Sequence, residues 1–499
     1  MFRNIAAAVM AASAVIQASA VGVNAVPGGL SSMIDNPAEI TELTLSGAID
    51  ARDIFFIADE MPALHTLDLS AVSIEPYEGA PLKQLMRYEG NEIPAGAFAG
   101  SQLGSVKLGR ANGAEPVALR IGNGAFAGTQ LESIDIPSGC IIGEGAFASC
   151  RRLVSANIAA DAVSAGAFAA CDALESVAAP SVKVVGEYAF TECVSLSDVR
   201  LGASLSEIGR NAFAGCTSLG AFTFPQSLVA VGASAFCRSG LVAADLSSCR
   251  NLPELGDWAF SQCGQLAEVK LPASVASLGE GSFFECASLV SVNMPVACAV
   301  INPYVLKGVA GVDAGELIGE GVSEIGDYAF SGNTATSAMV LPSSLERIGD
   351  RAMAGMTGLA DINAEQLDIV PELGRNVWAG VDQPSVTLRV LDAMYSAFAT
   401  ADQWKNFTVI NTTSESDIML SPRNKVRGCF DGHELKVDFG GLDADVLEIY
   451  DVAGVRLTVA DVSGEAGASI DTSAWQSRIY LVRVQLADGN VASLKLGRK

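Results

Sequence analysis

Two stretches, LGASLSEIGRNAFAGCTSL at 201–219 and LPASVASLGEGSFFECASL at 271–289, carry the same pattern of residues. In each stretch a glycine precedes a phenylalanine by four residues, and a cysteine follows that phenylalanine three residues later. The phrase returns many times along the chain of 499 residues. Recurrence at a fixed period indicates one structural unit repeated along the chain, and it decides the fold before any single element is assigned.

The phenylalanine position, here called the anchor, can be followed through thirteen copies of the repeat. The anchors are Phe98, Phe126, Phe147, Phe168, Phe190, Phe213, Phe236, Phe260, Phe283, Leu306, Phe330, Met353 and Trp378. Their mean spacing is about 23 residues, inside the range of about 20–29 that is typical of leucine-rich repeats. The sequence therefore predicts a leucine-rich-repeat solenoid of parallel β-strands joined by turns and short helices.

The position four residues before the anchor is glycine in ten of the thirteen copies. Pro94, Ser164 and Asn302 are the exceptions. Glycine, and next to it asparagine, tolerates a left-handed backbone better than other residues. We therefore interpret this position as a turn with positive φ in every coil.

A short strand pattern follows each anchor, as in the segment 131–137. Because side chains alternate along a strand, Ile134 and Ile136 are expected to point inward, and Ser133 and Asp135 outward. The outward positions of successive strands then form a stripe along the solenoid, where binding residues are expected.

The sequence divides into segments of different composition. The first twenty residues are typical of a secretory signal peptide, with Arg3, an apolar run at 5–16 and small residues at 18–20. The expected segments are a signal peptide at 1–20, an N-terminal cap with entry repeats at 21–95, the solenoid at 96–384, a C-terminal cap at 385–411, a linker at 412–424 and a β-sandwich at 425–499.

The period changes to two near the C-terminus. The segments 434–439, 446–459 and 478–486 alternate between apolar and polar residues as strands do. We therefore expect a small all-β domain of the Ig-like sandwich type after the solenoid.

The quoted repeats resemble the BspA-like leucine-rich-repeat proteins of Gram-negative bacteria, and the resemblance covers roughly residues 36–411. It implies an adhesin-like surface protein. The tail, with LEIYDVAGVRL at 447–457 and IDTSAWQSRIYLVRV at 470–484, resembles the C-terminal sorting domain of the type IX secretion system. That resemblance implies the type IX secretion machinery as a partner. An ordinary β-sandwich spacer is the alternative for the tail.

The chain is strongly acidic, with a formal charge of −25 and a pI of about 4.4. Such a surface repels phosphate backbones, so no nucleic-acid partner is expected. The apolar run at 5–16 is too short to span a bilayer, and no integral membrane span is expected. The expected location is therefore secreted or on the outer surface of the cell.

Residues for catalysis or for metal binding are scarce in this sequence. His65 and His433 are the only histidines, and they fall in different expected domains. The sequence carries no zinc pattern, P-loop or nucleophile elbow, and we expect no enzyme, catalytic residue, metal or cofactor. Six cysteines follow anchors by three residues, and we expect them to stack as buried thiols, with disulfides as the alternative.

The candidate ligand-binding residues are the polar outward positions of the strands and two tyrosines of a long insertion at 75–91. They are Asp135, Asn157, Asp198, Arg200, Asp245, Glu268, Lys270, Asn293, Glu316, Asp361 and Asn363 on the strands, and Tyr77 and Tyr88 in the insertion. The sequence favours a binding and adhesion protein for host or microbial extracellular proteins or glycans. A cell-envelope spacer without a specific ligand and a glycan-capture protein are the alternatives. The stripe carries no aromatic residue for sugar stacking, which weakens the second of them.

Overall fold

The computed structural model describes residues 19–83, 85–109, 118–293, 295, 298–412, 426–431, 433–451, 455–475, 479–487 and 491–497. Contacts divide the chain into two compact units, Met1–Ala244 and Asp245–Lys499, which are described separately below. The expected signal peptide lies outside the described residues except for Ser19 and Ala20, with which the first strand begins. The expected linker also lies outside them, except for Thr412.

The first unit begins with long parallel strands. β1 (Ser19–Ala25), β2 (Ile40–Ile49), β3 (Thr66–Ile74) and β7 (Ser105–Leu108) form one sheet in that order. Between them lie α1 (Leu30–Met33), η1 (Pro37–Glu39), α2 (Ala51–Glu60), β4 (Tyr77–Leu82), β5 (Leu85–Tyr88) and β6 (Glu92–Ile93). β4 and β5 pair as an antiparallel hairpin.

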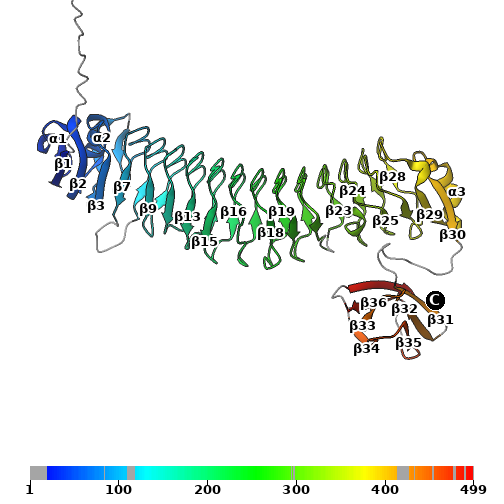
Figure 1. Cartoon of the computed structure of the whole chain (residues 1–499). Coiled ribbons are helices and arrows are strands. Elements are labelled where there is room, and N and C mark those ends of the chain that lie inside the picture. The colour runs from blue at the N-terminus through cyan, green and yellow to red at the C-terminus, as the bar shows by residue number, and fades with distance from the viewer. Residues whose placement is uncertain are drawn as a thin grey trace, which may run out of the picture. The chain divides into compact units, whose positions relative to one another are not determined.

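Regular coils follow, and most of them contribute one longer and one shorter strand to a series of short parallel sheets (Figure 1). The longer strands of the first unit are β9 (Ser133–Ile136), β11 (Ser155–Ile158), β13 (Ser176–Ala179) and β15 (Asp198–Leu201). The shorter ones are β8 (Arg120–Ile121), β10 (Ile141–Ile142), β12 (Ala162–Val163), β14 (Val184–Val185), β16 (Glu207–Ile208) and β17 (Ala230–Val231).

The second unit repeats the same arrangement. Its longer strands, starting at the division between the units, are β18 (Ala243–Asp245), β20 (Glu268–Lys270), β22 (Ser291–Val292), β25 (Ala338–Val340), β27 (Asp361–Asn363), β29 (Thr387–Leu391) and β30 (Thr408–Thr412). The shorter ones are β19 (Glu254–Leu255), β21 (Ser277–Leu278), β23 (Val300–Ile301), β24 (Glu324–Ile325), β26 (Arg347–Ile348) and β28 (Glu372–Leu373). The predicted parallel solenoid is confirmed.

The anchors form the core of each unit. The rings from Phe98 to Phe236 stack coil upon coil, with centroids 5.2–5.4 Å apart. In the second unit Phe260 stacks on Phe283 at 5.9 Å. Each coil is too thin to bury its own apolar face, so burial comes from stacking on neighbouring coils.

The glycine before the anchor serves close packing, and our interpretation of it as a left-handed turn is wrong. Residues with positive φ lie two residues before and two after the anchor, as Gly124 and Gly128 do around Phe126. At Gly122, a Cβ would lie 2.5 Å from the backbone nitrogen of Ala95 in the preceding coil. The repeat therefore favours glycine here because the backbones of adjacent coils approach closely, and the side chains of Ser164 and Asn302, two of the exceptions, donate hydrogen bonds to carbonyl oxygens of the preceding coil.

The cysteines of the repeat are buried beside the anchors. The thiols of Cys150, Cys171, Cys193 and Cys216 donate hydrogen bonds of 3.1–3.2 Å to the carbonyl oxygens of anchors. In each pair the carbonyl belongs to the anchor of the preceding coil. The thiol thus satisfies a backbone acceptor inside the core, which alanine at that position would leave without this donor.

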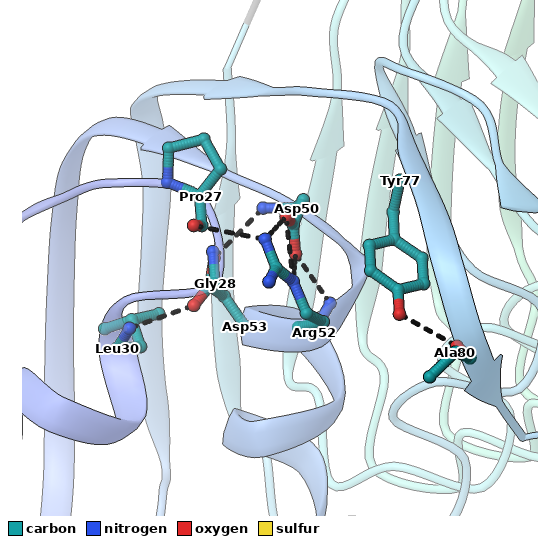
Figure 2. A network of polar contacts seen from close by, with 8 residues as sticks. All are labelled: Pro27, Gly28, Leu30, Asp50, Arg52, Asp53, Tyr77 and Ala80. Atoms are coloured by element: carbon teal, nitrogen blue, oxygen red, sulfur yellow. Dashed lines mark hydrogen bonds and ion pairs between the residues drawn. The ribbon is translucent and has the colours of Figure 1, made fainter.

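The N-terminal cap is held by a buried acidic pair at the start of α2 (Figure 2). Asp50 caps the helix, and the Asp53 carboxylate accepts hydrogen bonds from the backbone N–H groups of Gly28, Leu30 and Asp50 at 2.6–3.0 Å. Arg52 forms an ion pair with Asp50 at 2.6 Å. These contacts bind the segment after β1 to the helix that covers the entry strands.

The other end of the repeats is closed by an aromatic cluster. α3 (Asp392–Thr400) and η4 (Trp404–Asn406) lie between β29 and β30, after η3 (Gln383–Ser385). Trp404 and Phe407 are buried and contact Trp378 with ring centroids 5.5 and 5.0 Å apart. Tyr395 of α3 is 40% exposed and lies outside this buried cluster.

The C-terminal segment forms two antiparallel sheets. One contains β31 (Arg427–Asp431), β32 (Glu434–Asp438) and β35 (Gly467–Asp471). The other contains β33 (Ala444–Asp451), β34 (Arg456–Asp461), β36 (Ile479–Leu486) and β37 (Val491–Gly497). Leu435 and Val437 of the first sheet share one buried cluster with Leu447, Ile449 and Val482 of the second.

Candidate ligand-binding site on the strand face

The strand face, defined as the outward positions of the longer strands, is polar in the first unit. Asp135, Asn157 and Arg200 are exposed and Asp198 is half-buried. The Asn157 amide donates to Asp135 at 2.6 Å, and Arg200 pairs with Asp198 at 2.8 Å. The expected residues thus lie on the face but are engaged with one another, as on an ordinary solvated surface.

The same pattern continues on the face of the second unit. A hydrogen bond from the Ser247 hydroxyl holds the pKa of Asp245 below its ordinary value. Lys270 pairs with Glu268 at 3.2 Å. Asn293 binds the backbone of Leu271, accepting from its N–H at 2.7 Å, and this places it in a structural role.

The strand face changes in the coil of Leu306. Glu316, expected at an outward strand position, lies instead in a 3-10 helix, η2 (Ala314–Glu316). Asp313 caps this helix through a hydrogen bond from the N–H of Gly315. The strand prediction fails here because η2 packs against β25, where a Cβ on Gly315 would lie 2.4 Å from the carbonyl oxygen of Ala338.

A buried polar network fixes η2 beside β25. Asn333 follows its anchor by three residues, where other coils carry cysteine. Its amide donates to the carbonyl oxygens of Val309 and Val312, and its oxygen accepts from the Thr336 hydroxyl at 2.8 Å. The Thr336 hydroxyl in turn accepts from the N–H of Ala314 at 2.7 Å. Asn333 and Thr336 therefore tie the segment of η2 to the turn that follows the next anchor, Phe330.

A cavity of about 350 Å³ opens between η2 and the strand face. Its lining residues are Asp313, Gly315, Glu316, Ile318, Gly319, Glu320, Ala338, Met339, Val340, Pro342, Asp361, Asn363 and Arg389. The volume lies near the lower end of the range for ligand pockets, about 300–1,000 Å³. Three of the expected site residues, Glu316, Asp361 and Asn363, meet here.

The register of β25, β27 and β29 explains the arrangement of the lining. Val340 pairs with Asn363, and Asn363 with Arg389, so these three residues form one outward row. Ala338 and Asp361 form the neighbouring row. Arg389 Nε reaches across to Asp361 Oδ1 at 2.9 Å. The cavity thus combines small and aliphatic side chains with one bound guanidinium.

Asn363 was expected to be solvent-facing and is buried, with an exposed fraction of 7%. Its amide oxygen accepts from the N–H of Glu365 at 2.9 Å, and its amide nitrogen makes one long contact of 3.4 Å with the Glu365 carboxylate. The alternation along β27 predicted its direction correctly. Its burial follows from the neighbouring segments, which the strand pattern does not show.

The insertion tyrosines are also buried, so the expected role of Tyr77 and Tyr88 in an exposed binding loop is wrong. Each is less than a tenth exposed, and both pack with Phe55 of α2 in one apolar cluster. Their hydroxyl groups donate to carbonyl oxygens of the same hairpin, to Ala80 at 2.8 Å for Tyr77 (Figure 2). The hairpin therefore docks on the N-terminal cap through its aromatic rings.

The sequence analysis missed Arg389 because this residue falls in the expected C-terminal cap, although it occupies an outward position of β29.

The sequence analysis also missed a row of aromatic residues along one edge of the second unit. Half-buried Trp258, Tyr304 and Tyr328 each lie two residues before an anchor, and the last two stack at 5.2 Å. Lys307 Nζ lies 4.9 Å from the Tyr328 ring centroid. Their fixed distance from the anchor could have revealed this row.

A second hollow, of about 540 Å³, lies in the first unit between α2 and the turn at 95–103. The charged side chains that line it, Lys83 and Asp59, form an ion pair at 2.8 Å. Much of the remaining lining is the small-residue turn around Phe98. It offers fewer directing groups than the cavity on the strand face.

Among the residues that the structure describes, no group of three or more histidine, cysteine or acidic residues is arranged to hold a metal ion. Within the same part of the chain, no helix has the length and apolarity needed to cross a membrane.

Stacked parallel coils with a buried anchor in each define the class of leucine-rich-repeat solenoid proteins. The model of the BspA type leucine rich repeat region matches residues 86–195, 183–312 and 317–415, with six copies. The chain therefore belongs to the BspA-type leucine-rich-repeat family. No curated protein sequence matches it.

Solved structures resemble the fold. A leucine-rich repeat protein from Bacteroides ovatus is 20% identical, with a TM-score of 0.51 over 76% of this chain and 86% of that one. A leucine rich cell surface protein from Faecalibacterium prausnitzii is 23% identical, with a TM-score of 0.32 over 50% and 84% of the two chains. The pneumococcal vaccine antigen PcpA is 13% identical, with a TM-score of 0.37 over 74% and 80%.

Proposed function

We propose that the chain is a surface-exposed or secreted binding and adhesion protein that recognises host or microbial extracellular ligands through its strand face. Membership of the BspA-type family is consistent with a binding role. The formal charge of −25 favours basic partners, because a net field raises the rate of encounter with opposite charge.

The observation that carries this proposal is the cavity beside η2. Most outward residues of the stripe bind one another or the backbone and offer little to a ligand. At η2 the chain instead leaves its repeat and forms a hollow lined by aliphatic side chains, carboxylates and one bound guanidinium. Concave sites with a few directed polar groups are the usual form of ligand sites.

The test is a binding screen of the purified full chain against extracellular-matrix proteins and glycans. It is repeated with lysine at Asp198, Asp245, Glu268 and Glu316. A matched control carries lysine at four exposed glutamates, Glu207, Glu254 and Glu372 of the shorter strands and Glu346 just before β26. We expect the first variant to lose binding and the control to retain it.

Two results of this screen would contradict the proposal. Absence of any binder would favour the alternative of an envelope spacer without a specific ligand. Equal loss in both charge variants would indicate an effect of net charge and not a site on the strand face.

A second candidate function is glycan capture, and the aromatic row favours it. The strand face lacks aromatic residues, but Trp258, Tyr304 and Tyr328 place rings along the turn edge of the second unit. Aromatic rings are the usual stacking surface for sugars. Glycan binding that is lost in Trp258→Ala and kept in Ala338→Phe would assign the glycan site to this row.

We further propose that residues 425–499 form an Ig-like sandwich that acts as a type IX sorting domain. The two antiparallel sheets with one shared buried cluster support a separately packed segment. Cell fractionation with and without these residues tests it, beside a full-length chain with the exposed Cys429→Ser change. Periplasmic accumulation of the truncated chain is expected, and unchanged surface display would refute the sorting role.

A further inference from the structure

We infer that the cavity beside η2 takes a basic side chain, lysine or arginine, from an extracellular protein ligand. This inference rests on the proposed binding role of the strand face and names the chemistry of its specificity pocket.

The charges around the cavity favour a cation. Its lining holds the four carboxylates of Asp313, Glu316, Glu320 and Asp361 and one guanidinium, that of Arg389. Arg389 binds Asp361, Asp313 accepts the N–H of Gly315, and Glu320 is also engaged with another group. Glu316 is exposed at the end of η2, where it can meet an incoming ammonium or guanidinium group. A ligand of negative charge would meet an excess of carboxylates here.

The apolar part of the lining favours a long aliphatic stem. Ile318 and Pro342 are largely buried residues of the lining, and Ala338 and Val340 are half-buried on the outward side of β25. Lysine and arginine carry methylene stems that cover apolar surface while the charged head stays near water or carboxylates. A compact inorganic cation would leave this apolar surface unused.

Asn363 supplies an observation that does not depend on charge. It is more than nine-tenths buried and lines the cavity, yet its amide nitrogen makes only the 3.4 Å contact with Glu365. An amide nitrogen carries two N–H donors, and buried donors generally have acceptors. A backbone carbonyl of the ligand beside its basic side chain would supply one.

The size of the cavity restricts how much of a ligand enters it. At about 350 Å³ it admits a single amino-acid side chain with its adjoining backbone, and not a folded domain or a polymer segment. The rest of a protein ligand would lie over the polar stripe of the second unit. We therefore expect affinity for single peptides to be weak and that for a whole ligand to be higher.

The experiment uses the full chain and capped glycine pentapeptides whose central residue is lysine, norleucine or glutamate, with binding measured by ligand-observed NMR. We expect the lysine peptide to bind, the norleucine peptide to bind more weakly, and the glutamate peptide not to bind. Binding of the lysine peptide should weaken from 0.05 to 1 M NaCl because salt screens exposed charge pairs.

Two variants and two matched controls locate the binding. Ala338→Phe fills the cavity, while Ala243→Phe makes the same change at the first position of β18. Glu316→Gln removes one lining charge, while Glu346→Gln removes one on another exposed surface of the same unit. We expect Ala338→Phe to abolish peptide binding, and Glu316→Gln to weaken it about fivefold, as for a partly exposed pair. Both controls should bind as the unchanged chain does.

Equal binding of the lysine and norleucine peptides, or unchanged lysine binding in Ala338→Phe, would overturn the inference. The urea midpoint of each variant shows whether that variant is folded. If Ala338→Phe does not fold, Glu316→Gln still tests the inference. Binding of a matrix protein could be lost on charge reversal of the strand face and yet remain unchanged in Ala338→Phe. That result would contradict this inference and leave the proposed function standing. Absence of any captured ligand would instead count against the proposed function.

Discussion

At the scale of single residues, each position of the repeat has its own steric or conformational requirement. Positions only two residues apart, such as Gly122 and Gly124, have different requirements. Gly122 is required because its Cβ would meet the backbone of the preceding coil, 2.5 Å from Ala95 N. Gly124 has space for a side chain but a φ of 61°. Asn211 and Asn376 occupy the equivalent of Gly124 in other coils with positive φ.

These two glycines should therefore respond differently to substitution. Gly122→Ala is expected to destabilise the chain by about 1–3 kcal/mol, because backbone atoms cannot move aside as side chains do. Gly124→Asn is expected to cost well under about 1 kcal/mol, because asparagine tolerates the left-handed region. Urea denaturation of both variants measures the difference. Equal destabilisation would show that backbone conformation, and not contact between coils, explains the glycine of the repeat.

The buried thiols make stability depend on pH. Burial raises the pKa of Cys193 from 9.0 to about 12, because the thiolate would lose its hydration. The folded chain keeps a proton that the unfolded chain releases above pH 9.0, so this stabilisation is complete at pH 8 and declines as pH rises toward 12. Urea midpoints at pH 8 and pH 10.5 should show a smaller decline in Cys193→Ala than in the unchanged chain. The exposed Cys429→Ser variant is the control, and an identical decline in all three chains would contradict the assignment.

At the scale of elements, η2 shows how one residue of the repeat can redirect a segment. Cysteine at the position of Asn333 would point to one anchor carbonyl, whereas the asparagine amide reaches the carbonyls of both Val309 and Val312. The segment that would have formed a strand is thereby held beside β25. Asn333 and Gly315, which permits the close approach to β25, thus both help to hold η2 at the edge of the cavity.

Restoring cysteine at this position should release η2. In Asn333→Cys, the two carbonyl oxygens lose their donor, at a cost of about 1–3 kcal/mol for buried groups left unsatisfied. Hydrogen exchange of residues 311–322 is expected to accelerate, while that of the neighbouring anchor turns stays unchanged. Asn157→Cys on the exposed face of β11 is the control. Unaltered exchange at 311–322 would show that η2 is held by other contacts.

The N-terminal cap depends on α2 in a comparable way. The Asp53 carboxylate is buried and accepts three backbone N–H groups (Figure 2). Asp53→Asn replaces one acceptor oxygen by a donor of the same shape and is expected to cost about 1–3 kcal/mol. Hydrogen exchange should rise in residues 26–34 and not in β9 or β11. The exposed Asp59→Asn variant on the same helix should leave exchange in 26–34 as it is, and protection that survives Asp53→Asn would contradict this role.

At the scale of the whole molecule, the sequence could predict the features that recur in every coil. Thirteen anchors at a regular spacing predicted the solenoid, and the alternation around each strand predicted inward and outward positions such as Ile134 and Asp135. What it could not predict comes from contacts between segments distant in sequence. Docking of a hairpin on α2 buries Tyr77 and Tyr88, and the segment after η2 contributes to the surroundings of Asn363. Arg389 enters the cavity only because three strands align in register.

The central claim is that the strand face beside η2 binds the ligand. It is tested most directly by hydrogen exchange of the full chain with and without an extracellular ligand captured in the screen. The account predicts slowed exchange at 313–320, 338–342 and 361–363 on binding, and no such change in Ala338→Phe. Slowed exchange confined to the turns of Trp258, Tyr304 and Tyr328, or to β31–β37, would contradict it.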